Sequence, residues 1–397
     1  MSPLRVPAVP RGVLHIGVLL LALTTAATVV AQQTAADPAN APAAATPGAA
    51  PTPTSAAAPV KSIWPDPASS NVEPMPLASR TLLLDLVEAG KRAVAVGERG
   101  IVLVSDDRSQ WSQVVDVPTR ATLTAVAAVG NKVWAVGRDG VIIASADAGL
   151  HWTLQRSDPW RPAAADAADD ARHGAPLLDV LFIDEIHGFA IGAYSLFLET
   201  SDGGTTWTPR SILGASSDGL NDAKGSASES GTFSREQLKI ADESEPHFNA
   251  LARTSDGSLL IAGERGSLLR SRDNGAHWDR TKLPYDGSMF GALGFDGQRA
   301  IVFGLRGHVF ETDDLGDHWR EVKTGTELSL LGGTRLRGGG IALVGANGLV
   351  LMRRNATEAL HAGTVEPAGA LAAILPSEGA ATFVVAGENG IGRYQPK

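Results

Sequence analysis

Acidic boxes containing a glycine recur along this chain, and their residue types could bind calcium, support catalysis or turn a corner. The copies read "SADAGLHW" from Ser145, "TSDGGTTW" from Thr200, "SRDNGAHW" from Ser271 and "TDDLGDHW" from Thr312, with a degraded "SDDRSQW" from Ser105. A calcium loop needs regularly spaced oxygen ligands and a terminal bidentate glutamate, which these boxes lack. A motif repeated this often indicates architecture before chemistry.

Each complete box is predicted to be a structural turn. We expect its aspartate to accept hydrogen bonds from amides two residues on, its glycine to adopt the left-handed conformation, and its tryptophan to pack between sheets. The residues with these roles are Asp147, Gly149 and Trp152; Asp202, Gly204 and Trp207; Asp273, Gly275 and Trp278; and Asp314, Gly316 and Trp319.

Three histidines directly before box tryptophans could suggest a metal site. His151, His277 and His318 occupy equivalent positions in different repeats, so the fold should hold them farther apart than one shared ion allows. The chain has no cysteine, which excludes disulfides and thiolate ligands. We therefore expect no metal and no cofactor.

A second signature, an apolar run into a glycine, two residues and another glycine, gives the repeat number. Its first glycines are Gly97, Gly137, Gly192, Gly263, Gly304, Gly345 and Gly387. The basic period is about 41 residues, with insertions at about 161–175 and 214–243, and each repeat holds short apolar runs that predict four strands. The sequence thus predicts an all-β, seven-bladed β-propeller of four-stranded antiparallel blades. "VKSIW", ending at Trp64, is the candidate N-terminal strand that closes it.

The N-terminal residues divide into two segments before the propeller. Residues 1–31 have the basic start, apolar run and small residues of a secretory signal peptide; the alternative is an uncleaved membrane anchor. Residues 32–60 are almost wholly Ala, Pro and Thr and predict a disordered linker. The propeller is assigned to 61–397, and we expect a periplasmic or secreted protein.

The two signatures together, "VGxxGxI" and "[ST]xDxGxxW", resemble those of the photosystem II stability/assembly factor family over nearly the whole mature chain. The resemblance implies a seven-bladed, non-enzymatic factor that binds other proteins and assists assembly of a membrane complex in photosynthesis. Cyanobacterial members carry a lipid-anchoring cysteine that is absent here, which favours a relative from a non-photosynthetic bacterium.

Four arginines fall at the glycine-pair turns, on the face that should also carry both insertions: Arg99, Arg138, Arg265 and Arg306. One hypothesis is an electropositive patch that docks a carboxylate-rich or extended protein segment, as the family resemblance also implies. The alternative is that each arginine is a solvated turn residue paired with a neighbour such as Glu98 or Glu264. A formal charge of −9 without a basic run argues against nucleic acid.

The enzymatic alternative is a secreted sialidase-like propeller that binds or cleaves glycans. Such an enzyme needs a nucleophilic tyrosine paired with a glutamate, and the chain has only Tyr194, Tyr285 and Tyr394. Other glycosidases need two carboxylates facing the channel, and the first-strand segments supply few. We therefore expect no enzymatic activity, no small-molecule substrate, a membrane-associated protein partner and a monomer.

Overall fold

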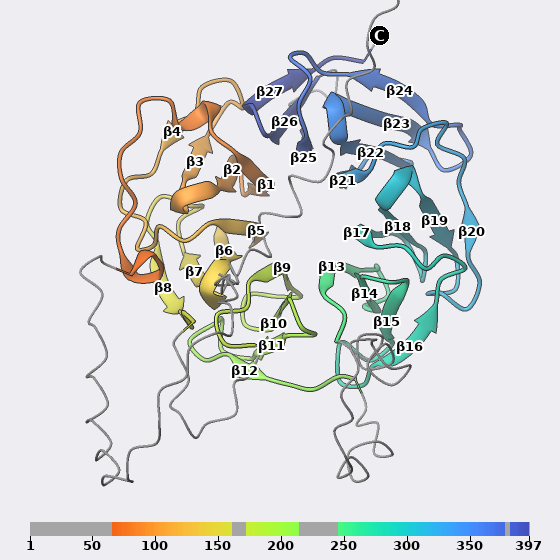
Figure 1. Cartoon of the computed structure of the whole chain (residues 1–397), viewed down its shortest axis with the longest axis horizontal. Helices are drawn as coiled ribbons and strands as arrows, with labels where there is room; N and C mark the ends of the chain where they lie inside the picture. Colours follow the sequence, from red (N-terminus) through yellow and green to blue (C-terminus); the bar gives the residue numbers. More distant parts are fainter. Residues whose placement is uncertain (1–65, 161–171, 214–244, 378–381, 397) are drawn as a thin grey trace, which may run out of the picture. The chain divides into compact units, whose positions relative to one another are not determined.

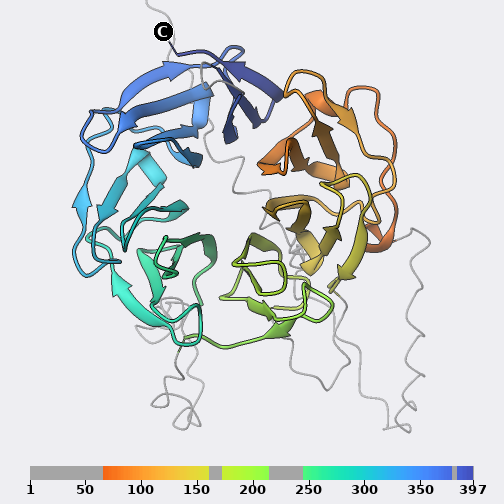
Figure 2. The ribbon, with the colours of Figure 1, turned by 180° about the vertical axis from the view of Figure 1, so that it is seen from behind.

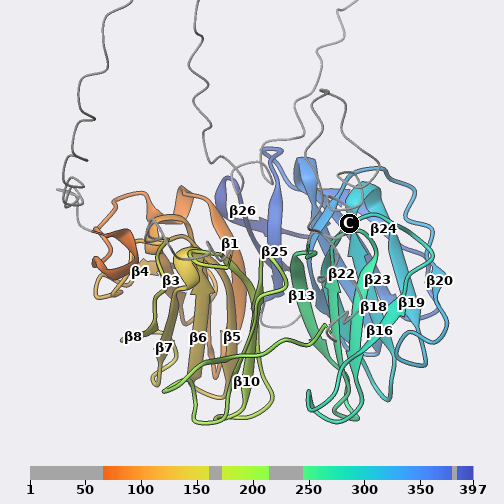
Figure 3. The ribbon, with the colours of Figure 1, turned by 60° about the horizontal axis from the view of Figure 1, so that its bottom comes forward.

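The computed structural model describes residues 66–160, 172–213, 245–377 and 382–396. They belong to one compact unit, Ser62–Lys397. Seven antiparallel sheets stand around a central axis, seen from its two ends in Figures 1 and 2. The tilted view in Figure 3 shows that the strands run between the two faces of the ring. The predicted all-β, seven-bladed propeller is confirmed.

The strands of each blade follow one another outward from the axis. The innermost strands are β1 (Leu83–Ala89), β5 (Leu123–Val129), β9 (Leu177–Phe182), β13 (Phe248–Arg253), β17 (Met289–Gly294), β21 (Leu330–Arg335) and β25 (Leu371–Pro376). The second strands are β2 (Arg92–Gly97), β6 (Lys132–Gly137), β10 (Gly188–Gly192), β14 (Leu259–Gly263), β18 (Ala300–Gly304), β22 (Gly339–Gly345) and β26 (Phe383–Gly387).

The outer half of each blade is shorter. The third strands are β3 (Val102–Ser105), β7 (Ile142–Ser145), β11 (Phe197–Thr200), β15 (Ser267–Ser271), β19 (Val309–Thr312), β23 (Leu349–Asn355) and β27 (Gly390–Tyr394). Fourth strands are described in six blades: β4 (Ser112–Gln113), β8 (Thr153–Arg156), β12 (Thr208–Pro209), β16 (Asp279–Lys282), β20 (Arg320–Glu321) and β24 (His361–Thr364). Single 3₁₀ turns complete the description: η1 (Pro67–Ser69), η2 (Ala78–Arg80), η3 (Glu98–Gly100), η4 (Arg138–Gly140), η5 (Leu305–Gly307) and η6 (Ala346–Gly348).

All seven first glycines of the repeat signature end a second strand. Gly97 has an extended φ of −171°, which any residue can adopt, so its φ does not explain the need for glycine. The reason is that another backbone segment approaches closely. A Cβ atom on Gly97 would lie 2.2 Å from the carbonyl oxygen of Leu82, just before the innermost strand. The other six repeat this approach at 2.1 to 2.4 Å. Positive φ angles occur later in the first turn, at Arg99 (φ 56°) and at Gly100 (φ 73°), the second glycine of the signature.

The core lies between blades, because each sheet buries both faces against its neighbours. Seven clusters of buried side chains fill the interfaces around the ring. Between the second and third blades, Trp134 stacks on Phe182 with ring centroids 3.6 Å apart. In the residues that the structure describes, no helix is long and apolar enough to cross a membrane.

The seventh blade has three strands among the described residues. The predicted closing strand "VKSIW" lies outside those residues. The described N-terminal segment, 66–80, contains 3₁₀ turns and no strand, and η2 packs against β27 before the chain enters β1. This segment therefore joins the last blade to the first.

Candidate protein-interaction face

Three of the four predicted arginines occupy one stereochemical position. At the first turn, Ile101 N donates to Glu98 O at 3.0 Å, and Arg99 (φ 56°, ψ 28°) and Gly100 (φ 73°) both lie in the left-handed region. These angles define a type I′ turn, which matches the twist of its two strands. Arg265 and Arg306 hold the same left-handed position, each followed by a left-handed glycine.

The fourth arginine differs. In the second blade the left-handed residue is Asp139, and Arg138 stands one position earlier. Arg138 is half-buried, whereas Arg99, Arg265 and Arg306 are exposed. The structure thus places all four at the same kind of turn but projects only three from its tip. We call the face that carries the turns between second and third strands the turn face.

An internal carboxylate already contacts one of these arginines. Glu73, from the N-terminal segment, lies 3.5 Å from the Arg99 guanidinium and also pairs with Arg120. Glu98 and Glu264, the neighbours proposed as arginine partners, have another role: each accepts a hydrogen bond from the N–H that leads into an innermost strand, Leu82 N at 3.2 Å and His247 N at 3.3 Å.

The described ends of both insertions lie on the turn face of the third blade. Arg172, the first described residue of the 161–175 insertion, pairs at 2.6 Å with Glu245, the first described residue after the 214–243 insertion. Arg172 Nε also donates to the carbonyl oxygen of Tyr194, at the turn of the third blade, at 3.2 Å. Residues 161–171 of the first insertion and the whole second insertion lie outside the described residues.

The aspartate boxes lie on the opposite face, which we call the box face. In the second blade, Asp147 Oδ1 accepts from Ser145 Oγ at 2.8 Å and from His151 N at 3.0 Å. Asp147 Oδ1 also accepts from Leu150 N at 3.1 Å, so the bonded amides are three and four residues on, where the sequence predicted two. Gly149 is left-handed (φ 87°), and Trp152 Nε1 donates to its carbonyl oxygen at 2.8 Å. The boxes of Asp202, Asp273 and Asp314 repeat the aspartate bonds, with a left-handed glycine in each.

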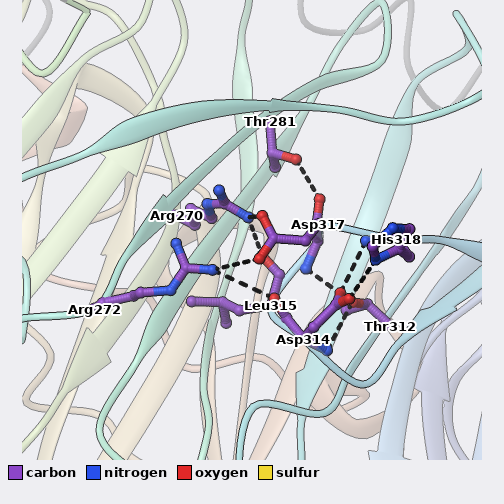
Figure 4. A network of polar contacts seen from close by, with 9 residues as sticks. Arg270, Arg272, Thr281, Thr312, Asp314, Leu315, Asp317 and His318 are labelled. Carbon is purple, nitrogen blue, oxygen red and sulfur yellow. Dashed lines mark hydrogen bonds and ion pairs between the residues drawn. The ribbon is translucent and has the colours of Figure 1, made fainter.

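Each complete box is also held by the preceding blade. Figure 4 shows the box of the fifth blade, where Arg270 and Arg272 of the fourth blade reach Asp317 at 2.5 and 2.9 Å. Arg270 also donates to the carbonyl oxygen of Leu315 at 3.2 Å. Trp319 packs into the cluster shared with the fourth blade. The box thus turns a corner and fastens two blades together.

The three box histidines bind their own aspartates rather than one another. Their Nδ1 atoms lie 2.6 to 2.7 Å from the box carboxylates, and the rings project into solvent. The N–H and imidazole of His277, with the Ser271 hydroxyl, hold the pKa of Asp273 well below its usual range. Among the described residues, no group of three or more metal-ligating side chains comes together.

Two carboxylates near the axis, Asp85 and Asp179, were not predicted from the sequence. Each innermost strand carries a β-bulge near its start. Asp85 and Asp179 directly follow the bulges of β1 and β9, and each accepts an N–H from the next blade: Val126 N at 2.8 Å and Leu251 N at 2.7 Å. Burial among the inner strands raises the pKa of Asp85 to about 6 and that of Asp179 to about 7. They join blades across the channel wall.

Comparison with known proteins points to one family. Its model, described as photosynthesis system II assembly factor YCF48, matches residues 170–223, a range that includes strands β9 to β12 of the third blade. The photosystem II assembly lipoprotein Ycf48 of Synechococcus sp. (strain CC9902) is 32% identical over 143 residues. The chloroplastic photosystem II stability/assembly factor HCF136 of Arabidopsis thaliana is 30% identical over 112 residues. The matches span 35% and 28% of this chain, and only 33% and 22% of the relatives.

Solved structures extend the similarity of fold to most of the chain. A structure titled "YCF48 bound to D1 peptide" superposes with a TM-score of 0.56 at 15% identity, covering 80% of this chain and 95% of the other. YCF48 from Cyanidioschyzon merolae superposes with a TM-score of 0.55, also at 15% identity, covering 81% and 98%. With the sequence matches, these structures support the resemblance drawn from the repeat signatures. The chain is a seven-bladed β-propeller that resembles the photosystem II assembly factors in fold and, over about a third of its length, in sequence.

Proposed function

We propose that this chain is an exported, non-enzymatic factor that binds another protein through its turn face and assists assembly of a membrane complex. The observation that carries the proposal is the shared geometry of Arg99, Arg265 and Arg306. Each stands at the tip of a type I′ turn, in a left-handed conformation that non-glycine residues adopt uncommonly. A rigid turn holds the guanidinium stem at small entropic cost, which favours charge-assisted binding of carboxylates.

The comparisons support a protein partner. A structural relative is titled as bound to a peptide, and the sequence relatives are named assembly factors. The partner of this chain belongs to the same chemical class in our proposal: an extended or carboxylate-rich segment of a membrane-associated protein. Export through an N-terminal signal and action as a monomer complete the proposal.

The placement of the tyrosines argues against a sialidase-like enzyme. Tyr194, Tyr285 and Tyr394 belong to the third, fourth and seventh repeats. Tyr285 packs on His308, which pairs with Glu321 at 2.6 Å. Tyr194 likewise packs on His247, whose Nδ1 lies 3.6 Å from Glu264. Burial, however, raises the pKa of the Tyr285 hydroxyl, which is opposite to the activation that a nucleophile needs.

A charge-reversal experiment tests the docking surface. Arg99, Arg265 and Arg306 are replaced together by glutamate, and capture of membrane proteins is measured by crosslinking pull-down. The matched control reverses Arg280, Arg337 and Arg354, three exposed arginines away from these turns, with the same change in net charge. We expect at least about a tenfold loss of capture for the turn variant, since each lost ionic contact is worth about 1 kcal/mol or more. Equal capture by both variants would refute the docking surface.

The enzymatic alternative is tested separately, by assaying the purified chain against a panel of sialosides and other glycosides. We expect no turnover above the uncatalysed rate. Turnover that disappears when Tyr285 is replaced by phenylalanine would overturn the non-enzymatic assignment.

A further inference from the structure

The third strand of the seventh blade is less buried than the third strands of the other blades. All four residues of β3, and all four of β19, are buried. In β27 only Gly390 is buried, Ile391, Gly392 and Tyr394 are half-buried, and Arg393 is exposed. The difference follows from sheet composition: six blades have a fourth strand outside the third, and the described residues provide none beside β27.

The segment that could supply this strand runs elsewhere. Ser79 O lies beside Gly390 just as Thr119 O lies beside Gly100, at 2.1 and 2.0 Å from a Cβ built on each glycine. Ser79 therefore occupies the place of a normal connection between blades. In the first blade the residues before that connection form β4, but the residues before Ser79 turn away from β27.

Hydrogen bonds to the first blade hold the residues before Ser79 away from β27. Val72 N donates to Val117 O at 2.9 Å, and Arg120 N donates to Pro67 O at 2.7 Å. These contacts lay the segment across the turn side of the first blade. Asp66 then reaches the second blade, where its charge contributes to raising the pKa of Asp139 after the larger effect of burial. In Figure 1 the red start of the described chain lies near β8, far around the ring from β27.

Apolar surface accompanies the open edge. Leu77, next to η2, is 61% exposed, the largest exposure among the large hydrophobic residues of the described chain. Met75, Trp111 and Ile391 of β27 pack in the same cluster. The edge of β27 thus lies beside an exposed apolar side chain, Leu77, next to η2, which packs against β27.

We propose that the outer edge of β27 accepts an extended segment of a partner protein as the fourth strand of the seventh blade. Backbone hydrogen bonds would give affinity, as in other cases of strand addition. Alternate side chains would meet Leu77 and Met75, and a carboxylate would suit Arg393. The proposal rests on the proposed function only in taking the partner to be a protein, and it concerns a different surface from the turn arginines.

The chain's own N-terminal sequence is a poor donor in cis. "VKSIW" ends at Trp64, two residues before Asp66, and two residues span at most about 7 Å. That is less than the roughly 10 Å between packed sheets, whereas reaching β27 requires crossing the whole first blade. Residues 32–59 carry Pro38, Pro42, Pro47, Pro51, Pro53 and Pro59, none of which can donate to a ladder.

Hydrogen exchange read by mass spectrometry tests the edge on the full-length chain. The probe is a synthetic peptide of residues 276–283, "AHWDRTKL", which contains the fourth strand of the fourth blade. We expect the amides of β27 to exchange faster than those of β3 in the free chain. The peptide should slow β27 at least about threefold and leave β3 unchanged. A peptide N-methylated at Arg280 and Lys282 should have no effect.

A second variant keeps the result interpretable. Residues 272–282 are appended after Lys397, so that the box turn and fourth strand of the fourth blade can complete the seventh blade in cis. We expect slow β27 exchange without peptide and no further response to it. The triple arginine variant should still respond to the peptide, so a failure of the turn face and a failure of this edge are distinguishable.

Three results would overturn the proposal. One is absence of any peptide effect on β27 in the unmodified chain. Another is protection of β27 in the free chain that disappears when residues 32–64 are deleted, which would identify the chain's own N-terminus as the occupant. The third is protection that grows with protein concentration, which would identify a second copy.

Discussion

At the scale of single residues, the box aspartates act as structural acceptors. Asp273 binds the Ser271 hydroxyl and the His277 N–H at 2.8 and 2.9 Å. Replacing Asp273 by alanine removes both bonds and the local turn that they hold. We expect the free energy of unfolding to fall, as measured by urea denaturation, because the Ser271 hydroxyl and the His277 N–H lose their acceptor.

The control for this prediction is Asp279→Ala, in the same blade. Asp279 is exposed at the start of β16, where a substitution should change stability by about 0.5 kcal/mol or less. If both variants were equally stable, the box would not be a structural turn.

Asp85 and Asp179, the carboxylates near the axis, make the free energy of unfolding depend on pH with the opposite sign to the box aspartates. The pKa of Asp179 is raised from 3.8 to about 7, first by burial and then by the charge of Asp85. The folded state therefore holds a proton that the unfolded state releases as pH rises from about 4 to 7. The free energy of unfolding should fall across this range and level off above it.

Asp179→Asn checks that slope. Asparagine cannot ionise, so we expect the variant to lose on the order of 2 kcal/mol of the decline in unfolding free energy between pH 4.5 and 7.5, even if a lost hydrogen bond lowers its stability throughout. Urea denaturation at several pH values is the measurement. An unchanged slope in the variant would show that Asp179 is ionised throughout and that burial does not control it.

The box aspartates affect the free energy of unfolding at lower pH than Asp179 does. Hydrogen bonds from His277 and Ser271 depress the pKa of Asp273, so its contribution to stability is present above about pH 4 and is lost as pH falls below that value. The two groups of carboxylates therefore predict greatest stability near pH 4 to 5 from these residues alone.

At the scale of the blade, the first glycine of each repeat limits how closely two strands meet. In Gly345→Ala the new Cβ atom would lie 2.1 Å from Ser329 O, a backbone atom that cannot move away cheaply. We expect a loss of at least about 2 kcal/mol in unfolding free energy, because the innermost and second strands must separate.

Gly325→Ala is the matched control for that substitution. Gly325 has a positive φ of 70° but no atom within 4 Å of its Cβ position, so only backbone strain applies, about 1 kcal/mol. Calorimetric melting of both variants compares the cost of the close backbone approach at Gly345 with the cost of backbone strain at Gly325. Equal losses would mean that close approach does not explain the repeated glycine.

The blades could be predicted from the sequence because the residues that form their turns are close together in the chain. A glycine at each second-strand end and the boxes of four blades depend on neighbouring residues, so spacing alone gave seven repeats. It did not reveal Asp85 or Asp179, whose partners Val126 and Leu251 lie in the next blade. Nor did it separate Arg138 from the other three arginines, because one position within a turn decides which side chain projects.

At the scale of the whole molecule, we assign stability to the box face and partner binding to the turn face. On the box face, carboxylates and arginines bind one another across blades, as Arg270 and Asp317 do at 2.5 Å. On the turn face, left-handed residues project from rigid turns. The closing of the ring was harder to predict from sequence, because the path of 66–80 depends on contacts with the first blade, such as Val72 with Val117.

Site-specific photocrosslinking in cells tests this division most directly. A photoreactive phenylalanine analogue replaces Asn347 at a turn of the sixth blade or, in a second strain, Asn274 in a box of the fourth. Both asparagines are exposed and left-handed, with φ of 56° and 55°, so the two substitutions are matched in strain. We expect a crosslinked membrane protein from position 347 and none from 274; adducts from 274 alone, or equally from both, would contradict the assignment of docking to the turn face.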